Sequence, residues 1–120
     1  MSKSILRDKS YIFAIRIVKL MQFLQKENKE FILSKQILRS GTSIGALLRE
    51  AEFGQSKKDF INKLSISLKE ANETEYWLCL LHDTNYIDLE LFQSLQSDCK
   101  GLIAMLVSSI KTAKKIKNKK

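Results

Sequence analysis

Apolar residues recur at steps of three and four along most of this chain, and no proline interrupts them. This period places the apolar side chains on one face of an α-helix, and without proline nothing forces a helix to stop. The first such segment should begin between Ser4 and Ser10 and end near Lys26. Its apolar seam consists of Phe13, Ile17, Leu20 and Leu24. The pattern predicts an all-α protein.

Two further helices follow, joined by a tight turn. We expect the second to use Ser34 as its N-cap and to end at Phe53, with Gly54 in the left-handed conformation that follows many helices. The third opens on Ser56-Lys57-Lys58-Asp59, which is close to a capping box, and should end near His82.

The fourth helix is expected to begin beside Asp88 and Glu90, because carboxylates are favourable at a helix N-terminus. It should run into a basic tail at about residues 111–120. Four amphipathic helices with short connections favour an antiparallel up-down-up-down four-helix bundle. No linker is long enough to separate two units, so residues 1–120 should form one domain.

Gly41 and Gly45 lie four residues apart inside the second predicted helix. Each interior glycine costs about 1 kcal/mol relative to alanine, so we expect a closely packed neighbour to offset that cost. The neighbour could belong to the same protomer or to another subunit, and the sequence leaves both open. A bulky substitution such as Gly45→Leu should therefore disturb stability or assembly.

The chain carries a formal net charge of +8, and this charge is distributed unevenly. In the predicted topology, both termini and the turn between the second and third helices gather at one end of the bundle. Residues 1–9, 49–60 and 111–120 hold twelve Lys or Arg against four acidic residues, a net charge of +8. The opposite end, residues 26–35 and 82–90, holds three basic against five acidic residues, a net charge of −2.

A basic end of this kind attracts nucleic acid or an anionic membrane surface. A solubilising, frayed helix end is the alternative interpretation of the tail by itself, and no lipidation motif adds a second membrane anchor. Lysines would contact phosphates, which position nucleic acid without reading its sequence, so binding should be salt-dependent and weakly selective. The candidate nucleic-acid-binding residues are Lys57, Lys58, Lys111, Lys114, Lys115, Lys117, Lys119 and Lys120.

The chain offers little for metal binding. A di-iron bundle needs two Glu-x-x-His motifs, and there is one histidine. Cys79 and His82 have half of a zinc-binding spacing. The other thiol, Cys99, falls about 12 Å away along the bundle if the last two helices pair about a turn near Asn85. We therefore expect two reduced, mostly buried thiols, no metal and no cofactor.

Nothing in the sequence suggests catalysis either. The acids of the second and third helices are expected to face solvent or to pair with basic neighbours. The acids are Glu50, Glu52, Glu70, Glu73 and Glu75, and the expected partners are Arg39, Arg49, Lys63 and Lys69. Neither the histidine nor any serine has an evident nucleophile setting. We expect a protein without enzymatic activity.

The sequence contains no candidate membrane span. The longest strongly apolar run, residues 102–107, is far shorter than the roughly 20 residues that cross a bilayer. Arg16 and Lys19 interrupt the stretch that would have to be the apolar core of a signal peptide. These observations predict a cytoplasmic protein without integral membrane association.

Five short motifs in the middle of the chain are distinctive: Arg39–Ala46, Arg49–Ala51, Ser56–Phe60, Lys69–Thr74 and Tyr76–Leu78. In this combination they resemble the small bacterial family of four-helix bundle proteins, also called 23S rRNA intervening-sequence proteins. The spacing fits without gaps, and the flanking helices match in length and character. The resemblance therefore covers essentially the whole chain.

The resemblance implies an antiparallel four-helix bundle, commonly assembled as a ring-like homopentamer. Relatives of the family include the accessory variability protein of diversity-generating retroelements, which binds nucleic acid and a reverse transcriptase through a basic surface. The chain departs from the family pattern at Leu47, where Asn is usual, and at Ser67, where Ala is usual. Within the matching motifs, Ser43, Glu50 and Glu73 join the two glycines as candidates for close packing or subunit contact.

Together these observations favour a non-enzymatic, homo-oligomeric bundle that binds RNA or DNA electrostatically through its basic end. The alternative is a protein-interaction scaffold or accessory subunit. Such a protein would dock a partner, for example a reverse transcriptase, without direct contact to nucleic acid.

Overall fold

Four helices make up almost all of the protein in the computed structural model, which describes residues 2–118 and the side chains of residues 5–116. The helices form a rod of 53 × 23 × 21 Å. Their bounds are α1 Ser2–Glu27, α2 Leu33–Glu52, α3 Lys57–Asp83 and α4 Leu89–Asn118. The described residues include no strand, and the predicted all-α class is confirmed.

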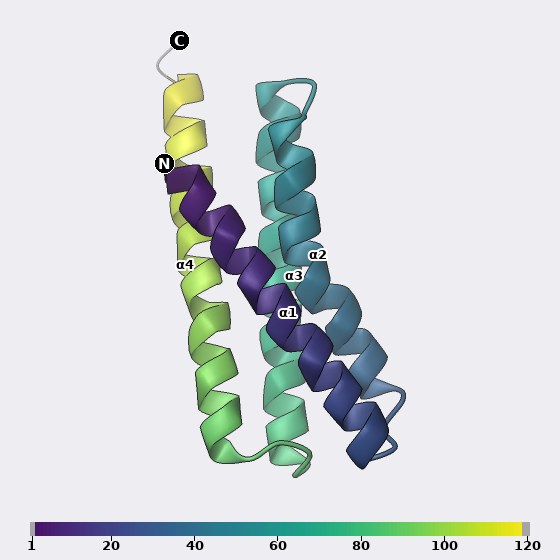
Figure 1. Ribbon diagram of the computed structural model, residues 1–120. Coiled ribbons are helices and arrows are strands. Elements are labelled where there is room, and N and C mark those ends of the chain that lie inside the picture. Colours follow the sequence, from purple (N-terminus) through teal and green to yellow (C-terminus); the bar gives the residue numbers. More distant parts are fainter. Residues whose placement is uncertain (1, 119–120) are drawn as a thin grey trace.

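The helices run alternately up and down, which confirms the predicted topology (Figure 1). α2 packs against α1 and α3, and α3 packs against α4. α1 crosses the bundle obliquely, so its contact with α4 is the smallest of the four pairings. The start of α1, the α2–α3 turn and the end of α4 lie at the same end of the rod.

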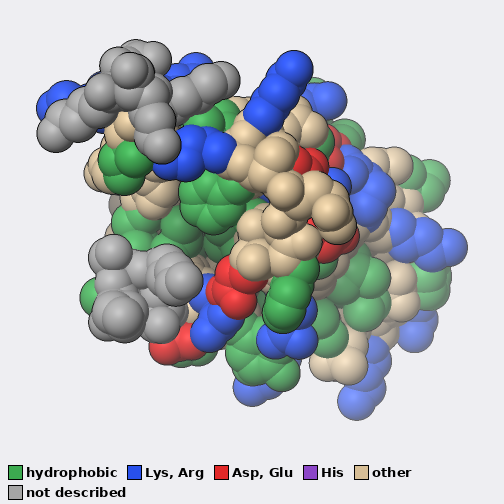
Figure 2. Space-filling model, turned by 90° about the horizontal axis from the view of Figure 1, so that it is seen from above, with side chains coloured by type: hydrophobic (Ala, Val, Ile, Leu, Met, Phe, Trp, Pro, Cys, Tyr) green, Lys and Arg blue, Asp and Glu red, His purple; other side chains and the backbone are tan. Residues whose placement is uncertain are grey.

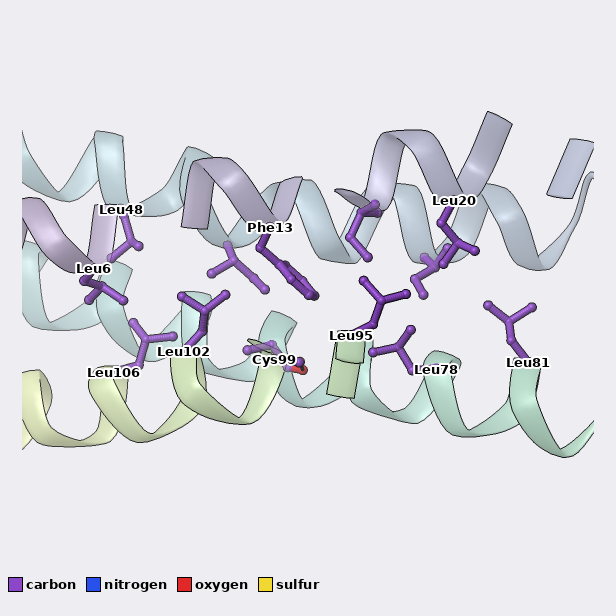
Figure 3. Close-up of a cluster of buried hydrophobic side chains, with 14 of the residues drawn as sticks. Leu6, Phe13, Leu20, Leu48, Leu78, Leu81, Leu95, Cys99, Leu102 and Leu106 are labelled. Carbon is purple, nitrogen blue, oxygen red and sulfur yellow. Dashed lines mark hydrogen bonds between the residues drawn. The ribbon is translucent and has the colours of Figure 1, made fainter. Parts of the chain in front are cut away.

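Side chains from all four helices meet in one core between them (Figure 3). The predicted seam of α1 is buried as expected. The helix itself begins at Ser2, before the predicted window of Ser4 to Ser10, because no glycine or proline interrupts residues 2–10. The most deeply buried large side chains include Phe13, Ile17, Leu24, Ile37, Ile44, Leu64, Leu78, Leu81, Leu95 and Leu106.

The N-terminus of α2 is capped differently from the prediction, which had Ser34 as the N-cap. α2 begins at Leu33, and the carboxylate of Glu30 accepts hydrogen bonds from the backbone N–H groups of Ile32, Leu33 and Ser34 at 2.7–3.2 Å. The Ser34 hydroxyl is buried and donates to the Glu30 carbonyl at 2.8 Å. A carboxylate has about four acceptor sites and can satisfy all three of these donors, whereas a hydroxyl oxygen has about two such sites.

The predicted left-handed conformation of Gly54 is wrong. The described left-handed residues are Lys29 and Asn85, at φ 55° and 69°, and no glycine has a positive φ. Gly54 instead leaves room, because a Cβ there would lie 3.0 Å from Oδ2 of Asp59 and 3.2 Å from the carbonyl oxygen of Ala51. This turn needs glycine for space rather than for backbone handedness.

The predicted starts of α3 and α4 are confirmed. The Ser56 hydroxyl accepts the Asp59 N–H at 3.1 Å, and the Asp59 carboxylate accepts the Gln55 N–H at 3.3 Å. At α4 the Asp88 carboxylate accepts the Leu91 N–H at 2.8 Å. These caps satisfy backbone donors that have no partner within the helix.

Candidate nucleic-acid interface

The candidate lysines gather where α3 begins and α4 ends. Lys57 and Lys58 occupy the first turn of α3, immediately after the Ser56 cap, and both are exposed. Lys111, Lys114 and Lys115 lie near the end of α4 and are also exposed. Of the remaining candidates, the Lys117 side chain and all of Lys119 and Lys120 lie outside the described residues.

Two adjoining hollows connect four of the five lysines with described side chains, all except Lys57, on the α3–α4 side of the bundle. Lys58 and Lys114 border the same hollow of about 580 Å³, one from each helix. A second hollow of about 570 Å³ on α4 includes Lys111, Lys114 and Lys115, so Lys114 lies between the two. We call the two hollows together the α3–α4 groove. Its remaining described lining is Ser56, Asp59, Ile61, Asn62, Ser65, Ala104, Val107, Ser108 and Thr112.

Two of the four acidic residues near this end form ion pairs with basic residues outside the candidate set, whereas Asp59 lines the α3–α4 groove. Glu52 pairs with Arg7, and Glu50 pairs with Lys63 at 3.3 Å. Among the described side chains, none of the five candidate lysines takes part in an ion pair. Within residues 5–9, 49–60 and 111–116, eight basic side chains stand against four acidic ones, a net charge of +4.

Viewed from this end, Lys and Arg side chains extend outward around much of the rim, with the visible acidic side chains lying among them (Figure 2). Ammonium groups in such positions are free to meet an anion without first breaking an ion pair. The electrostatic attraction therefore remains available to a polyanionic ligand.

Gly41 and Gly45 are closely packed against α1 of the same protomer. A Cβ on Gly41 would lie 2.9 Å from two side-chain carbons of Ile17, and a Cβ on Gly45 would lie 3.0 Å from the Ser10 hydroxyl. Of the two neighbours that the sequence left open, the one in the same chain is present. A subunit contact through this face stays a prediction.

The other candidates for close packing lie on the surface of α2 and α3. The Ser43 hydroxyl donates to the carbonyl of Arg39 at 2.6 Å within α2. Glu50 is exposed and forms its ion pair with Lys63 across the two helices. The hydrogen bond of Ser43 therefore stays within α2, whereas the ion pair of Glu50 joins α2 to α3.

Glu73 belongs to a cluster that joins α2 to α3. Its carboxylate pairs with Arg39, which also pairs with Glu70 at 3.0 Å, and it accepts the Trp77 indole N–H at 3.1 Å. The hydrogen bond from Arg39 lowers the pKa of Glu73 below its ordinary value of 4.5, and the Trp77 bond adds to this effect. The same contact raises the pKa of Arg39. The predicted pairing is confirmed for Glu50, Glu70 and Glu73. Glu52 and Glu75 instead pair with Arg7 and Lys100, which were not among the predicted partners.

The α2–α3 interface also contains buried hydrogen bonds that were not predicted from the sequence. Thr74 donates to the Ser40 hydroxyl at 2.9 Å, and Ser67 donates to the Ile44 carbonyl at 3.0 Å. All four of these residues are buried. Among the described side chains, no buried nitrogen or oxygen lacks a partner. The Ser67 hydroxyl thus adds a hydrogen bond between α2 and α3.

Both thiols are free, as predicted. Cys99 is buried and donates to the carbonyl of Ala71 at 3.3 Å. Ala71 precedes Cys79 by eight residues, so the two thiols are offset by about 12 Å along α3. Burial raises the pKa of Cys99 from 9.0 to about 12, and burial also raises that of the half-buried Cys79.

Asn62 and Ser65 of the α3–α4 groove were missed at the level of sequence. They follow Lys58 at steps of four and three and therefore lie on the same face of α3. That spacing could have identified them. It could not have shown that Lys114 of α4 lies across from this face.

Four antiparallel helices with lysines gathered at one end define the class of protein: an up-down-up-down bundle with a basic end. The chain belongs to the 23S rRNA-intervening sequence protein family, whose family model matches residues 2–108. It is 58% identical to a protein of unknown function from the S23 ribosomal protein family of Bacteroides thetaiotaomicron, whose crystal structure superposes with a TM-score of 0.91. That similarity covers 92% of this chain and 99% of the other.

No functionally curated protein matches the chain. In the part of the chain that the structure describes, no helix combines the length and hydropathy needed to cross a membrane. The family match ends at residue 108, so the α4 lysines at 111–115 lie beyond it.

Proposed function

We propose that this protein is a non-enzymatic, oligomeric bundle that binds RNA or DNA electrostatically through its basic end. The observation that carries this proposal is the group of five exposed lysines at the start of α3 and the end of α4, which form no ion pair among the described side chains. Lys58 of α3 and Lys114 of α4 border the same hollow, so one ligand can contact both helices.

Each lysine acts as a point charge on a phosphate, so affinity comes from neutralising phosphates and releasing counterions. If all five contact a duplex, the logarithm of the binding constant should fall with the logarithm of salt at a slope of about −4.5. Between 50 and 200 mM salt this corresponds to a loss of roughly 500-fold in affinity. Sequence selectivity should be weak, because phosphate contacts carry no base information.

The test is fluorescence anisotropy with structured RNA and duplex DNA at low salt. The variant carries Lys58→Gln, Lys111→Gln and Lys114→Gln, and its control carries Lys26→Gln, Lys29→Gln and Lys35→Gln at the opposite end. Both triple variants lose the same net charge. We expect the first to bind much more weakly, with a salt slope smaller by about 2.7, and the second to bind nearly as the parent does. Absence of binding, or an equal loss in the two variants, would refute the proposal.

The oligomeric assembly that this proposal includes is supported by the outward face of α1. Large apolar side chains remain exposed there, Tyr11 at 64% and Ile12 at 58%. A contiguous exposed apolar patch often marks an interaction site, whereas single scattered apolar residues do not. The exposed large apolar residues of α1 are Ile5, Tyr11, Ile12, Ile15 and Phe23.

We propose that this face joins copies of the chain, as in the ring that the family resemblance implies. Ile12→Glu should reduce the mass measured by light scattering, whereas Ile32→Glu, at a still more exposed position between α1 and α2, should not. An unchanged mass in Ile12→Glu would refute this assignment. Capture of a protein partner from nuclease-treated lysate, together with no nucleic-acid binding, would favour the accessory-subunit alternative.

A further inference from the structure

We infer that the ligand of the basic end is double-helical nucleic acid, held by its phosphate backbone along the α3–α4 groove. This inference rests on the proposed function and adds both the form of the nucleic acid and its path over the protein. It follows from three properties of the groove: where its lysines lie, what lines it, and where the exposed aromatic residues lie.

The lysines of the groove come from two helices and follow its length. Lys58 on α3 and Lys114 on α4 border one hollow, and Lys111 and Lys115 extend the charge along α4. Lys111 and Lys115 are four residues apart, about 6 Å along the helix axis. Phosphates of one strand follow each other at about 3.4 Å along a duplex axis. A backbone in the groove can therefore meet several ammonium groups in succession.

The rest of the described lining is polar or aliphatic and cannot stack on bases. Its polar members include Asn62, Ser65, Ser108 and Thr112, and its apolar members are aliphatic or small, with no aromatic residue among those described. Asn62, Ser108 and Thr112 can donate hydrogen bonds, whereas the Ser65 hydroxyl already donates to the Ile61 carbonyl at 3.0 Å. Hydroxyl and amide groups of this kind commonly contact phosphate and sugar. The described lining contains one carboxylate, that of Asp59, and it accepts the Gln55 N–H within the turn.

Proteins that bind single strands rely on aromatic platforms, and each stacked base contributes about 1–3 kcal/mol. Here the exposed aromatic residues lie elsewhere. Tyr11 and Phe53 line a separate hollow between α1 and α2. Tyr76 of α3 lies eleven residues beyond Ser65, about 17 Å along the helix. A double helix keeps its bases stacked inside and presents phosphates, so it matches the groove better than a single strand does.

The experiment compares probes of equal charge. Labelled DNA and RNA duplexes of about 20 base pairs, or two helical turns, are titrated with the full chain by fluorescence anisotropy, beside single strands of about 40 nucleotides. We expect each duplex to bind at least tenfold more tightly than the single strand. Equal binding of DNA and RNA duplexes assigns recognition to the shared phosphate backbone, and a preference for one identifies which duplex the groove accepts.

Paired variants test the path. Lys58→Gln with Lys114→Gln removes charge from both walls of the groove, and Lys26→Gln with Lys35→Gln removes the same charge from the opposite end. The groove variant should lose at least tenfold in duplex affinity, with a salt slope smaller by about 1.8, and the control should lose little. Thermal unfolding of both should match the parent, since all four lysines are exposed and form no ion pair among the described side chains.

The outcomes distinguish failure of the duplex inference from failure of the proposed nucleic-acid binding. Equal or tighter binding of the single strand, or duplex binding that the groove variant retains, overturns the inference while the proposed function stands. No binding of any probe overturns both. Duplex preference that disappears in the groove variant supports both.

Discussion

Gly41 and Gly101 allow one prediction to be worked out in detail, because the same substitution meets opposite surroundings. Both glycines lie inside helices, Gly41 in α2 and Gly101 in α4. A Cβ on Gly41 would lie 2.9 Å from two carbons of Ile17, whereas a Cβ on Gly101 would meet nothing within 4 Å. Replacing each with alanine therefore separates helix propensity from packing.

The magnitudes follow from two opposing effects. Alanine is favoured over glycine in a helix interior by about 1 kcal/mol, and this gain applies at both positions. At Gly41 the added methyl group overpacks the core, which typically costs about 1–3 kcal/mol. Ile17 is fully buried, and its β-branched side chain has little rotamer freedom to move aside. We expect Gly101→Ala to stabilise by about 1 kcal/mol and Gly41→Ala to destabilise by up to about 2 kcal/mol.

The assay is urea unfolding followed by circular dichroism at matched protein concentration. The free energies of unfolding of the two variants should differ by about 1–3 kcal/mol, the overpacking cost itself. Ile17→Ala, which removes both crowded carbons, should cost less in the Gly41→Ala background than alone. If Gly41→Ala is as stable as Gly101→Ala, the close approach of α1 to α2 at this glycine is wrong.

Three further predictions concern buried or paired groups. In the folded protein at pH 8, Cys79 should react with thiol reagents before Cys99 does. The reason is that a pKa of about 12 instead of 9.0 lowers the thiolate fraction of Cys99 about 1,000-fold. Rapid labelling of Cys99 would contradict its burial. Thr74→Val should cost about 1–3 kcal/mol in urea unfolding by leaving the buried Ser40 hydroxyl without this partner, and no loss would show that the bond is not needed. The lowered pKa of Glu73 means that its ionised carboxylate stabilises the fold above pH 4.5, and this effect disappears as pH falls through the lowered value. The melting temperature of Glu73→Gln should therefore approach that of the parent in acid. A constant difference in melting temperature from pH 7 to pH 3 would refute this linkage.

The helices were largely predictable because their signals are local. A period of three and four residues places apolar side chains on one face whatever lies opposite, and the seam from Phe13 to Leu24 is buried as that period requires. The Ser56 and Asp88 caps were equally local, since each side chain bonds a backbone N–H three residues later. The cap of α2 is equally local, since Glu30 accepts the Leu33 N–H three residues later, but serine is the more usual N-cap residue and the prediction therefore assigned this role to Ser34.

Only part of the candidate interface could be predicted in the same way. The lysines and their gathering at one end follow from charge and topology. The groove does not, because Lys58 and Lys114 are 56 positions apart in the chain and meet only when α3 and α4 pack. The pairing of Glu50 and Glu52 with Lys63 and Arg7, which leaves the candidate lysines outside the described ion pairs, likewise joins residues of different helices.

By itself the sequence determined the class of the fold, the family and the uneven distribution of charge, since each depends on residue type and spacing along one chain. Tertiary structure decided which neighbour fills the space beside Gly41, which acids are neutralised, and which lysines share a surface. The physical reason is range. Helix formation depends on residues three or four positions apart, whereas packing and ion pairing depend on distances in space between segments that the sequence keeps apart.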